Sequence, residues 1–206
     1  MKNIFKILIS QILVSSLISC NSGEQKETKM EKPIHKEHNQ LANEFTHQNI
    51  VILDIAYSIN DSVQILFREV VDQYLLLAEA LVEGDTNKVD QSAGLLAKRV
   101  KSIPVDSFYG EGLNAWTQHA GLYEEKLKEM QHIKGLGNKR SYFAHVSEIM
   151  YCTVKSFDIQ ARSLFAAYCP MALDGKGAYW LTASKTILNP YFGNEMLNCG
   201  EIKEEL

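Results

Sequence analysis

The sequence predicts a mainly α-helical protein: an antiparallel up-and-down bundle with a small irregular or β-structured lobe at its C-terminus. Two observations carry this prediction. Apolar residues recur at steps of three and four through most of residues 47–160, as on one face of a helix. In residues 161–206 this spacing fails, and glycine, proline, asparagine and aromatic residues become dense. With 206 residues, 46% of them hydrophobic, the chain is long and apolar enough for one domain plus a tail.

Residues 1–19 have the pattern of a bacterial lipoprotein signal peptide. Lys2 and Lys6 precede an apolar stretch, residues 7–18, that is too short to span a bilayer. The stretch leads through Leu-Ile-Ser to Cys20 and resembles a lipobox, although an ordinary signal peptide with a chance cysteine is the alternative. Cys20 would become the mature N-terminus and carry acyl chains such as palmitate, which anchor the protein to a membrane. The residue after Cys20 is Asn21 and not an aspartate. We therefore expect the lipid to anchor the protein in the outer membrane, with the protein facing the periplasm.

Residues 20–46 are polar, charged and without periodicity, which predicts a flexible tether between the lipid and the folded part. The formal net charge of the whole chain is −4. A protein of this charge lacks the basic surface that nucleic-acid binding requires, so we expect no nucleic-acid partner.

Four stretches with helical spacing form the predicted bundle. They cover residues 52–81, 89–103, 113–130 and 143–157. The polar pair Asn60-Asp61 suggests an interruption of the first stretch. Gly84 and Asp85 suit the end of one helix and the start of the next, and Pro104 and Gly135 separate the others. Short connections between amphipathic helices are typical of an up-and-down bundle.

Few bundle residues suggest chemistry. Trp116 and Tyr123 follow the apolar stripe and are expected in the core, and Cys152 is expected to be a small buried filler. His119 and His145 are displaced from the stripes, so we expect surface or boundary imidazoles and retain them as additional candidate metal ligands. The chain contains no nucleophile–base signature, nucleotide-binding loop or Cys-x-x-Cys pair, so we expect no enzyme.

Two sulfur-bearing pairs distinguish the C-terminal segment. Cys169 and Met171 flank Pro170 in a segment expected to be extended, in which residues two apart face the same side. Met196 and Cys199 are three apart and would be neighbours on one helical turn. Thiolates and thioethers are soft ligands that favour Cu(I), so these four residues are the predicted metal site. The alternative, left open by the spacing, is a Cys169–Cys199 disulfide with the methionines as filler.

Residues 169–200 contain four motifs: Cys-Pro-Met, Gly-Ala-Tyr-Trp-Leu, Asn-Pro-Tyr-Phe-Gly and Met-Leu-x-Cys-Gly. With these motifs, the C-terminal segment resembles a bacterial domain-of-unknown-function family of exported helical domains. The resemblance covers about residues 60–204, and the stretch 74–84 looks like the family's first helix. Family members occur as stand-alone lipoproteins and as C-terminal extensions of periplasmic adaptor subunits of copper/silver efflux pumps. The Cys-Pro-Met wording also looks like the heavy-metal-binding segment of such adaptors, although Tyr168 directly precedes the cysteine and Ala172 replaces the usual histidine.

The resemblance implies an association with copper handling. The sequence therefore predicts a lipid-anchored envelope protein that binds Cu(I) or a similar soft metal for copper homeostasis or efflux, with a periplasmic efflux adaptor as a candidate partner. The alternative is a non-catalytic structural or interaction module in which Cys169 and Cys199 form a disulfide and no metal is bound.

Overall fold

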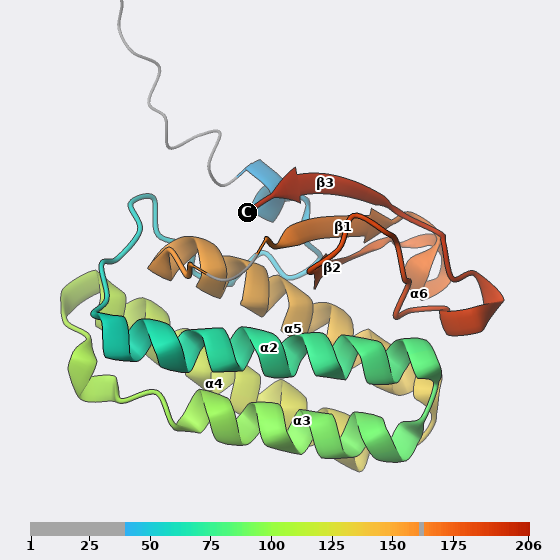
Figure 1. Ribbon diagram of the computed structural model, residues 1–206, viewed down its shortest axis with the longest axis horizontal. Helices are drawn as coiled ribbons and strands as arrows, with labels where there is room; N and C mark the ends of the chain where they lie inside the picture. Colours follow the sequence, from blue (N-terminus) through green and yellow to red (C-terminus); the bar gives the residue numbers. More distant parts are fainter. Residues whose placement is uncertain (1–39, 161–162) are drawn as a thin grey trace, which may run out of the picture. The chain divides into compact units, whose positions relative to one another are not determined.

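A computed structural model describes residues 40–160 and 163–206. The predicted signal peptide, Cys20 and most of the predicted tether lie outside these residues. Four long helices form an antiparallel bundle, as the sequence predicts, and a small sheet follows at the C-terminus (Figure 1). The four helices are α2 (Asp61–Glu83), α3 (Thr86–Lys101), α4 (Gly110–His132) and α5 (Leu136–Phe157). Within the described residues, no helix is both long and apolar enough to cross a membrane.

Local capping sets the ends of the first two helices. The Asn60 side chain accepts a hydrogen bond from Val63 N at 3.0 Å, and α2 ends at Gly84, whose φ of 77° is the left-handed conformation that glycine favours. The Asp85 carboxylate accepts from the first turn of α3 and starts the next helix. The helical stripe predicted from residue 52 was wrong before Asn60, because the chain there is irregular and makes its hydrogen bonds to other elements.

Residues 40–59, the N-terminal strap, lie along the bundle rather than free in solvent. The strap begins with the short helix η1 (Gln40–Glu44) and continues without regular structure. Its backbone groups bond to side chains of α4 and α5: Val51 N to Gln118 Oε1 at 2.7 Å and Leu53 N to Ser156 Oγ at 3.0 Å. Phe45, in the part predicted as the end of the tether, is buried between Tyr151 and Tyr179. The described end of that segment therefore belongs to the fold.

Aromatic side chains fill one end of the bundle core. Phe67 of α2 packs edge-on against Trp116 of α4, with ring centroids 5.0 Å apart, and stacks on Phe157 of α5 at 5.4 Å. Trp116 and Tyr123 are both buried, which confirms that they belong to the core. Edge-to-face and offset contacts of this kind add to the hydrophobic stabilisation of the helices.

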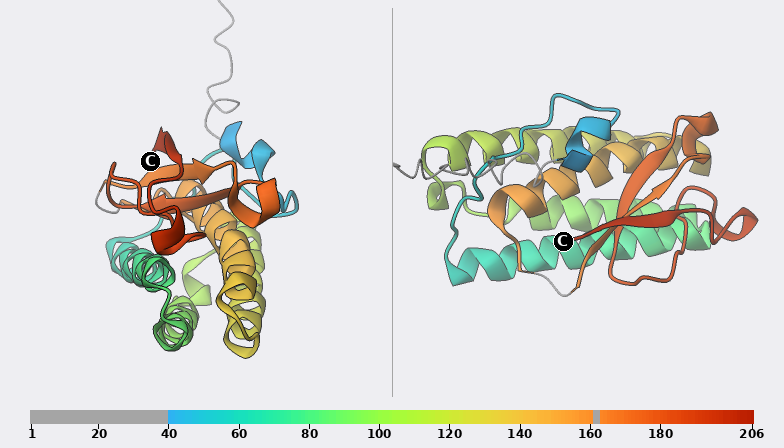
Figure 2. Two further views of the ribbon diagram at one scale, coloured as in Figure 1. Left: turned by 90° about the vertical axis from the view of Figure 1, so that its right-hand side faces the viewer. Right: turned by 90° about the horizontal axis from the view of Figure 1, so that it is seen from above.

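The lobe is a three-stranded antiparallel sheet with the strand order β2-β1-β3. Its strands are β1 (Phe165–Cys169), β2 (Ala178–Thr182) and β3 (Glu201–Glu205), with the single-turn helix α6 (Ala172–Gly175) between the first two and the short helix η3 (Gly193–Glu195) before the third. Figure 2 shows the sheet on one side of the bundle, where β2 contacts α5 and η3 contacts α2.

Tyrosine hydroxyls cover the outer edge of β2. Tyr74 of α2 is fully buried; its hydroxyl lies 2.7 Å from Ser147 Oγ of α5 and accepts a hydrogen bond from Leu181 N at 3.0 Å. The Tyr191 hydroxyl donates to the carbonyl oxygen of Tyr179. Because an unpaired strand edge exposes donors and acceptors, these hydroxyls satisfy the edge and attach it to the bundle.

We predict that Tyr74→Phe destabilises the protein by about 1–3 kcal/mol, because it leaves the buried Leu181 N–H without its acceptor. Chemical denaturation measures this loss. Tyr109→Phe is the control, because Tyr109 is 71% exposed, and it should change stability by less than about 0.5 kcal/mol. Equal effects of the two substitutions would show that the Tyr74 hydroxyl does not couple the lobe to the bundle.

Candidate functional site

Two of the predicted site residues meet in the lobe. Cys169 Sγ and Cys199 Sγ lie 2.6 Å apart, although 30 positions separate them in the chain. Cys169 is the last residue of β1 and is fully buried, whereas Cys199 lies in the loop before β3 and is partly exposed. The pair therefore consists of a buried thiol on a strand, Cys169, and a partly exposed thiol on a loop, Cys199. Both are free cysteines in this structure.

Asn189 holds the loop that carries Cys199. Its side-chain Nδ2 donates to Cys199 O at 2.6 Å, and its Oδ1 accepts from Tyr191 N at 2.7 Å and Phe192 N at 3.3 Å. Its own backbone N–H donates to Leu197 O at 2.8 Å. Asn189 is fully buried, and its hydrogen bonds hold the backbone of the loop at Cys199.

Gly200 lets the loop approach the sheet closely. A Cβ atom at this position would lie 2.7 Å from Trp180 Cη2 and 3.0 Å from Tyr168 O, and the φ of Gly200 is 139°. Both facts require glycine directly after Cys199. The Cys-Gly pair of the C-terminal motif thus places the second thiol against the end of β1.

The two methionines lie beside the cysteines in a different way from the one predicted. β1 ends at Cys169, and Met171 is in a turn with φ −89° and ψ −10° instead of continuing the strand. The Met171 side chain is 53% exposed, and its backbone N–H donates to the Cys199 sulfur. Met196 is not helical, so the expected helical turn was wrong; instead its carbonyl oxygen accepts from Cys199 N at 3.0 Å and closes a non-helical turn.

The contact with Cys169 favours the protonated form of the Cys199 thiol. Hydrogen bonding to Cys169, followed by desolvation, raises the pKa of the Cys199 thiol to about 11. A metal ion that binds here must therefore displace protons, and its affinity will fall at lower pH. Cys152, the third described cysteine, is buried in α5, and desolvation raises the pKa of its thiol, which confirms an inert core position.

The geometry of the cysteine pair suits two kinds of chemistry. Two thiolates that bind one ion at the ~2.3 Å typical of zinc–sulfur bonds lie ~3.8 Å apart at a tetrahedral angle. The observed 2.6 Å is shorter, so metal binding requires the sulfurs to separate, and the loop around Cys199 is the part without regular structure. Oxidation to a disulfide instead requires the two sulfurs to come closer together than they are here.

The two bundle histidines do not join the cysteines. His119 is 0% exposed and His145 is 8% exposed, so the expectation of boundary positions was wrong. Both are covered by the N-terminal strap, which the sequence did not predict to pack there. Within the described residues, no group of three or more His, Cys, Asp or Glu side chains is arranged to hold a metal ion.

His119 is held as a neutral imidazole. Its Nε2 lies 2.7 Å from Val51 O, and because a carbonyl oxygen only accepts, Nε2 carries the proton. Its Nδ1 lies 3.1 Å from Thr153 Oγ1. Burial lowers the pKa of His119 to about 4, although the hydrogen bond to Val51 opposes this shift.

A second cluster, which the sequence did not predict, joins the strap to α5. The rings of His47 and His145 stack with centroids 3.5 Å apart. His47 Nδ1 donates to Glu148 Oε2 at 2.5 Å, and the same buried carboxylate accepts from Thr46 N at 2.9 Å. The pKa of His145 is lowered to about 4 by desolvation, then by the positive charge of His47 and Lys126, and its Nε2 is buried without a hydrogen-bond partner. Long-range contacts create this cluster, and no local spacing signals it.

Comparison with known families adds one match. Residues 70–162 are similar to the family described as "Protein of unknown function (DUF3347)". The matched segment begins within α2, includes the Tyr74–Gly84 stretch and ends before β1, so the Cys-Pro-Met motif lies outside it. No curated protein and no solved structure matches the chain.

We predict that the protein loses stability in mild acid. The unfolded chain takes up protons near pH 6.5 at His119, whereas the folded protein does so only near pH 4. Stability is therefore full above pH 6.5 and declines as the pH falls towards 4, by about 2–3 kcal/mol from His119 alone. Urea denaturation at pH 7.0, 5.5 and 4.5 measures this.

His119→Gln keeps a donor for Val51 O but does not titrate, so it should flatten the pH dependence. His132→Gln, at an exposed position on α4, is the control and should leave the pH dependence unchanged. A profile that His119→Gln does not alter would contradict the assignment.

We also predict that Asn189→Ala destabilises the protein by about 2–3 kcal/mol and accelerates alkylation of Cys199 in the reduced protein, because it frees the loop. Denaturation and timed thiol labelling measure the two effects. Asn138→Ala removes one exposed hydrogen bond, from Nδ2 to Lys134 O at 2.9 Å, and should change neither quantity appreciably. Unchanged labelling in Asn189→Ala would mean that Asn189 does not position the thiol.

Proposed function

We propose that this protein is a non-catalytic, lipid-anchored protein of the outer membrane, facing the periplasm, that binds Cu(I) or a similar soft metal ion through Cys169 and Cys199. The observation that supports this best is the meeting of two thiols from distant segments, one of them accessible from solvent. Two-coordinate and three-coordinate sulfur sites favour Cu(I) over harder cations. The resemblance of the C-terminal motifs to copper-associated exported domains agrees with this chemistry.

The residues of such a site would have different roles. Cys169 is the fixed ligand, because β1 pairs with a strand on each side. Cys199 is the ligand that moves, because rotation of its side chain separates the two sulfurs while Asn189 retains its backbone. Met171, whose side chain is exposed and whose backbone N–H donates to the Cys199 sulfur, is a candidate third ligand, and Met196 is the other. A bound soft ion would replace the two thiol protons and hold β1 and the loop together.

Partial exposure of the outer thiol suits transfer of the ion to another protein. A ligand-exchange partner needs access to one sulfur while the other retains the metal. Cys199 provides that access, and we propose a periplasmic efflux adaptor as the acceptor. Histidines 119 and 145 have no part in this proposal because both are engaged with the strap.

A disulfide between the same two cysteines is the second candidate, favoured by the 2.6 Å separation of the sulfurs. In the oxidising periplasm it would close the end of the β1–β3 ladder and make the lobe a rigid interaction module. Metal binding and the disulfide are mutually exclusive states of one pair. The redox state of the isolated protein therefore distinguishes them.

The test uses a Cys20→Ser background, so that only the three described cysteines remain. After reduction, anaerobic titration with Cu(I) against a chromogenic chelator should show one equivalent bound. Cys169→Ser and Cys199→Ser should each weaken binding by about 100-fold or more. Cys152→Ser is the matched control and should bind like the parent, because its thiol is buried away from the pair.

Two results would contradict copper binding. One is a titration in which Cys169→Ser and Cys199→Ser bind as tightly as Cys152→Ser. The other is protein isolated from the periplasm that lacks metal and whose intact mass is lower by two hydrogen atoms, with that difference lost in Cys199→Ser. The second result would establish the disulfide instead.

A further inference from the structure

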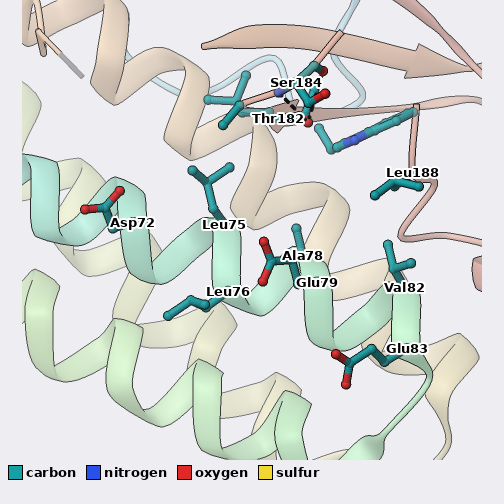
Figure 3. Close-up of a pocket in the computed structure, with 13 residues that line it drawn as sticks. Asp72, Leu75, Leu76, Ala78, Glu79, Val82, Glu83, Thr182, Ser184 and Leu188 are labelled. Atoms are coloured by element: carbon teal, nitrogen blue, oxygen red, sulfur yellow. Dashed lines mark hydrogen bonds between the residues drawn. The ribbon is translucent and has the colours of Figure 1, made fainter. Parts of the chain in front are cut away.

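An open groove lies between α2 and the segment that follows β2, away from the cysteine pair. Its volume is about 630 Å³, in the range of sites that accept a small ligand or a few side chains. Figure 3 shows Leu75 and Val82 of α2 directed towards the lobe, and Leu188 on the facing side. Trp180 and Leu181 of β2 also line it.

Large apolar side chains are left exposed in this groove. Leu76 is 50% exposed and Leu188 is 47% exposed, although both lie beside a well-packed core. The run Leu75-Leu76-Leu77 gives α2 an apolar surface wider than the stripe that packs into the bundle, where only Leu77 is fully buried. Exposed apolar side chains that line a groove of this size point to an interaction site.

The charged residues that line the groove are all acidic. Of the described residues that line it, Asp72, Glu79 and Glu83 carry carboxylates and none is basic. Glu83 pairs with exposed Lys88 outside the groove, at 2.5 Å. The lobe side contributes the hydroxyl groups of Thr182 and Ser184. An acidic rim repels anionic lipid and nucleic acid and attracts a cationic partner.

The edge of β2 limits how a partner binds. The Tyr74 hydroxyl accepts from Leu181 N, and the Tyr191 hydroxyl donates to Tyr179 O. Ser184 N donates to Thr182 Oγ1 at 3.3 Å, which satisfies the backbone where the strand ends. Because these groups are already paired, an incoming peptide does not extend the sheet, and its affinity must come from side chains placed in the groove.

A second copy of the chain is a poor occupant. In a symmetric dimer over this groove, the same surface meets itself, so the three carboxylates of one copy would face those of the other. We infer that the groove binds a basic segment of a partner protein, with aliphatic side chains inserted against Leu76 and Leu188 and lysine or arginine side chains facing the acidic rim.

The test uses a fluorescein-labelled peptide of eight alternating leucine and lysine residues, with fluorescence anisotropy as the readout. We expect saturable binding that weakens as salt is raised, because exposed charge pairs are screened. A leucine–glutamate peptide should not bind, and a serine–lysine peptide should bind at least about tenfold more weakly, because it lacks the apolar contribution.

Two pairs of variants locate the site. Leu76→Ser and Glu79→Lys, both at exposed positions in the groove, should each weaken binding by about tenfold. Their controls are Leu95→Ser on α3, where the side chain is similarly exposed at 48%, and Glu124→Lys on α4, which should both bind like the parent. Circular dichroism confirms that all four variants are folded.

Three outcomes would overturn the proposal. In the first, the groove variants and their controls change the affinity for the leucine–lysine peptide equally. In the second, the protein prefers the leucine–glutamate peptide. In the third, sedimentation shows a dimer that Leu76→Ser dissociates. The experiment involves no cysteine or metal, so its result is independent of the copper proposal.

Discussion

The structure depends on the burial of most of α5. Fifteen of its 22 residues are buried, including Lys139, Ser147, Glu148, Thr153 and Ser156. A buried polar group costs free energy unless it is hydrogen-bonded, so each of these side chains requires a partner from another element. The Lys139 ammonium, for example, donates to Asp90 of α3 at 2.5 Å and to Met130 O of α4 at 2.8 Å.

The same requirement explains why the strap and the lobe are attached where they are. Glu148 and Ser156 bond to backbone groups of the strap, and Ser147 meets the Tyr74 hydroxyl that also holds β2. On the outer side, Glu204 of β3 accepts from the Tyr151 hydroxyl and the Lys155 ammonium, each at 2.7 Å. A four-helix bundle alone would leave these groups unpaired, so the added segments complete the fold.

This arrangement separates three features by position. The cysteine pair lies at the end of β1, the histidines lie beneath the strap, and the groove lies between α2 and β2. His145 Nε2 is the only buried side-chain nitrogen or oxygen atom in the described part of the chain that lacks a partner. We therefore expect mild acid to act first on the strap contacts, whereas the proposed metal binding or disulfide would act on the lobe.

Local sequence determined the helices and their limits. Three-and-four spacing, the caps at Asn60 and Asp85 and the glycine at position 84 act within a few residues, so the four helices were predicted correctly, apart from the residues before Asn60. Pro170 likewise predicts the extended segment at β1. The identity of the core aromatics and the two sulfur motifs could also be read from the sequence.

Only the tertiary structure decided which of these residues meet. The helical pattern before Asn60 failed because side chains of α4 and α5 satisfy the strap backbone there. His119 became a buried imidazole only because the strap covers it. Cys169 and Cys199 come together through strand pairing and the Asn189 hydrogen bonds, and Met171 leaves the strand at Pro170. Spacing along the chain carries no information on such contacts, because they depend on which faces remain to be buried once the helices have formed.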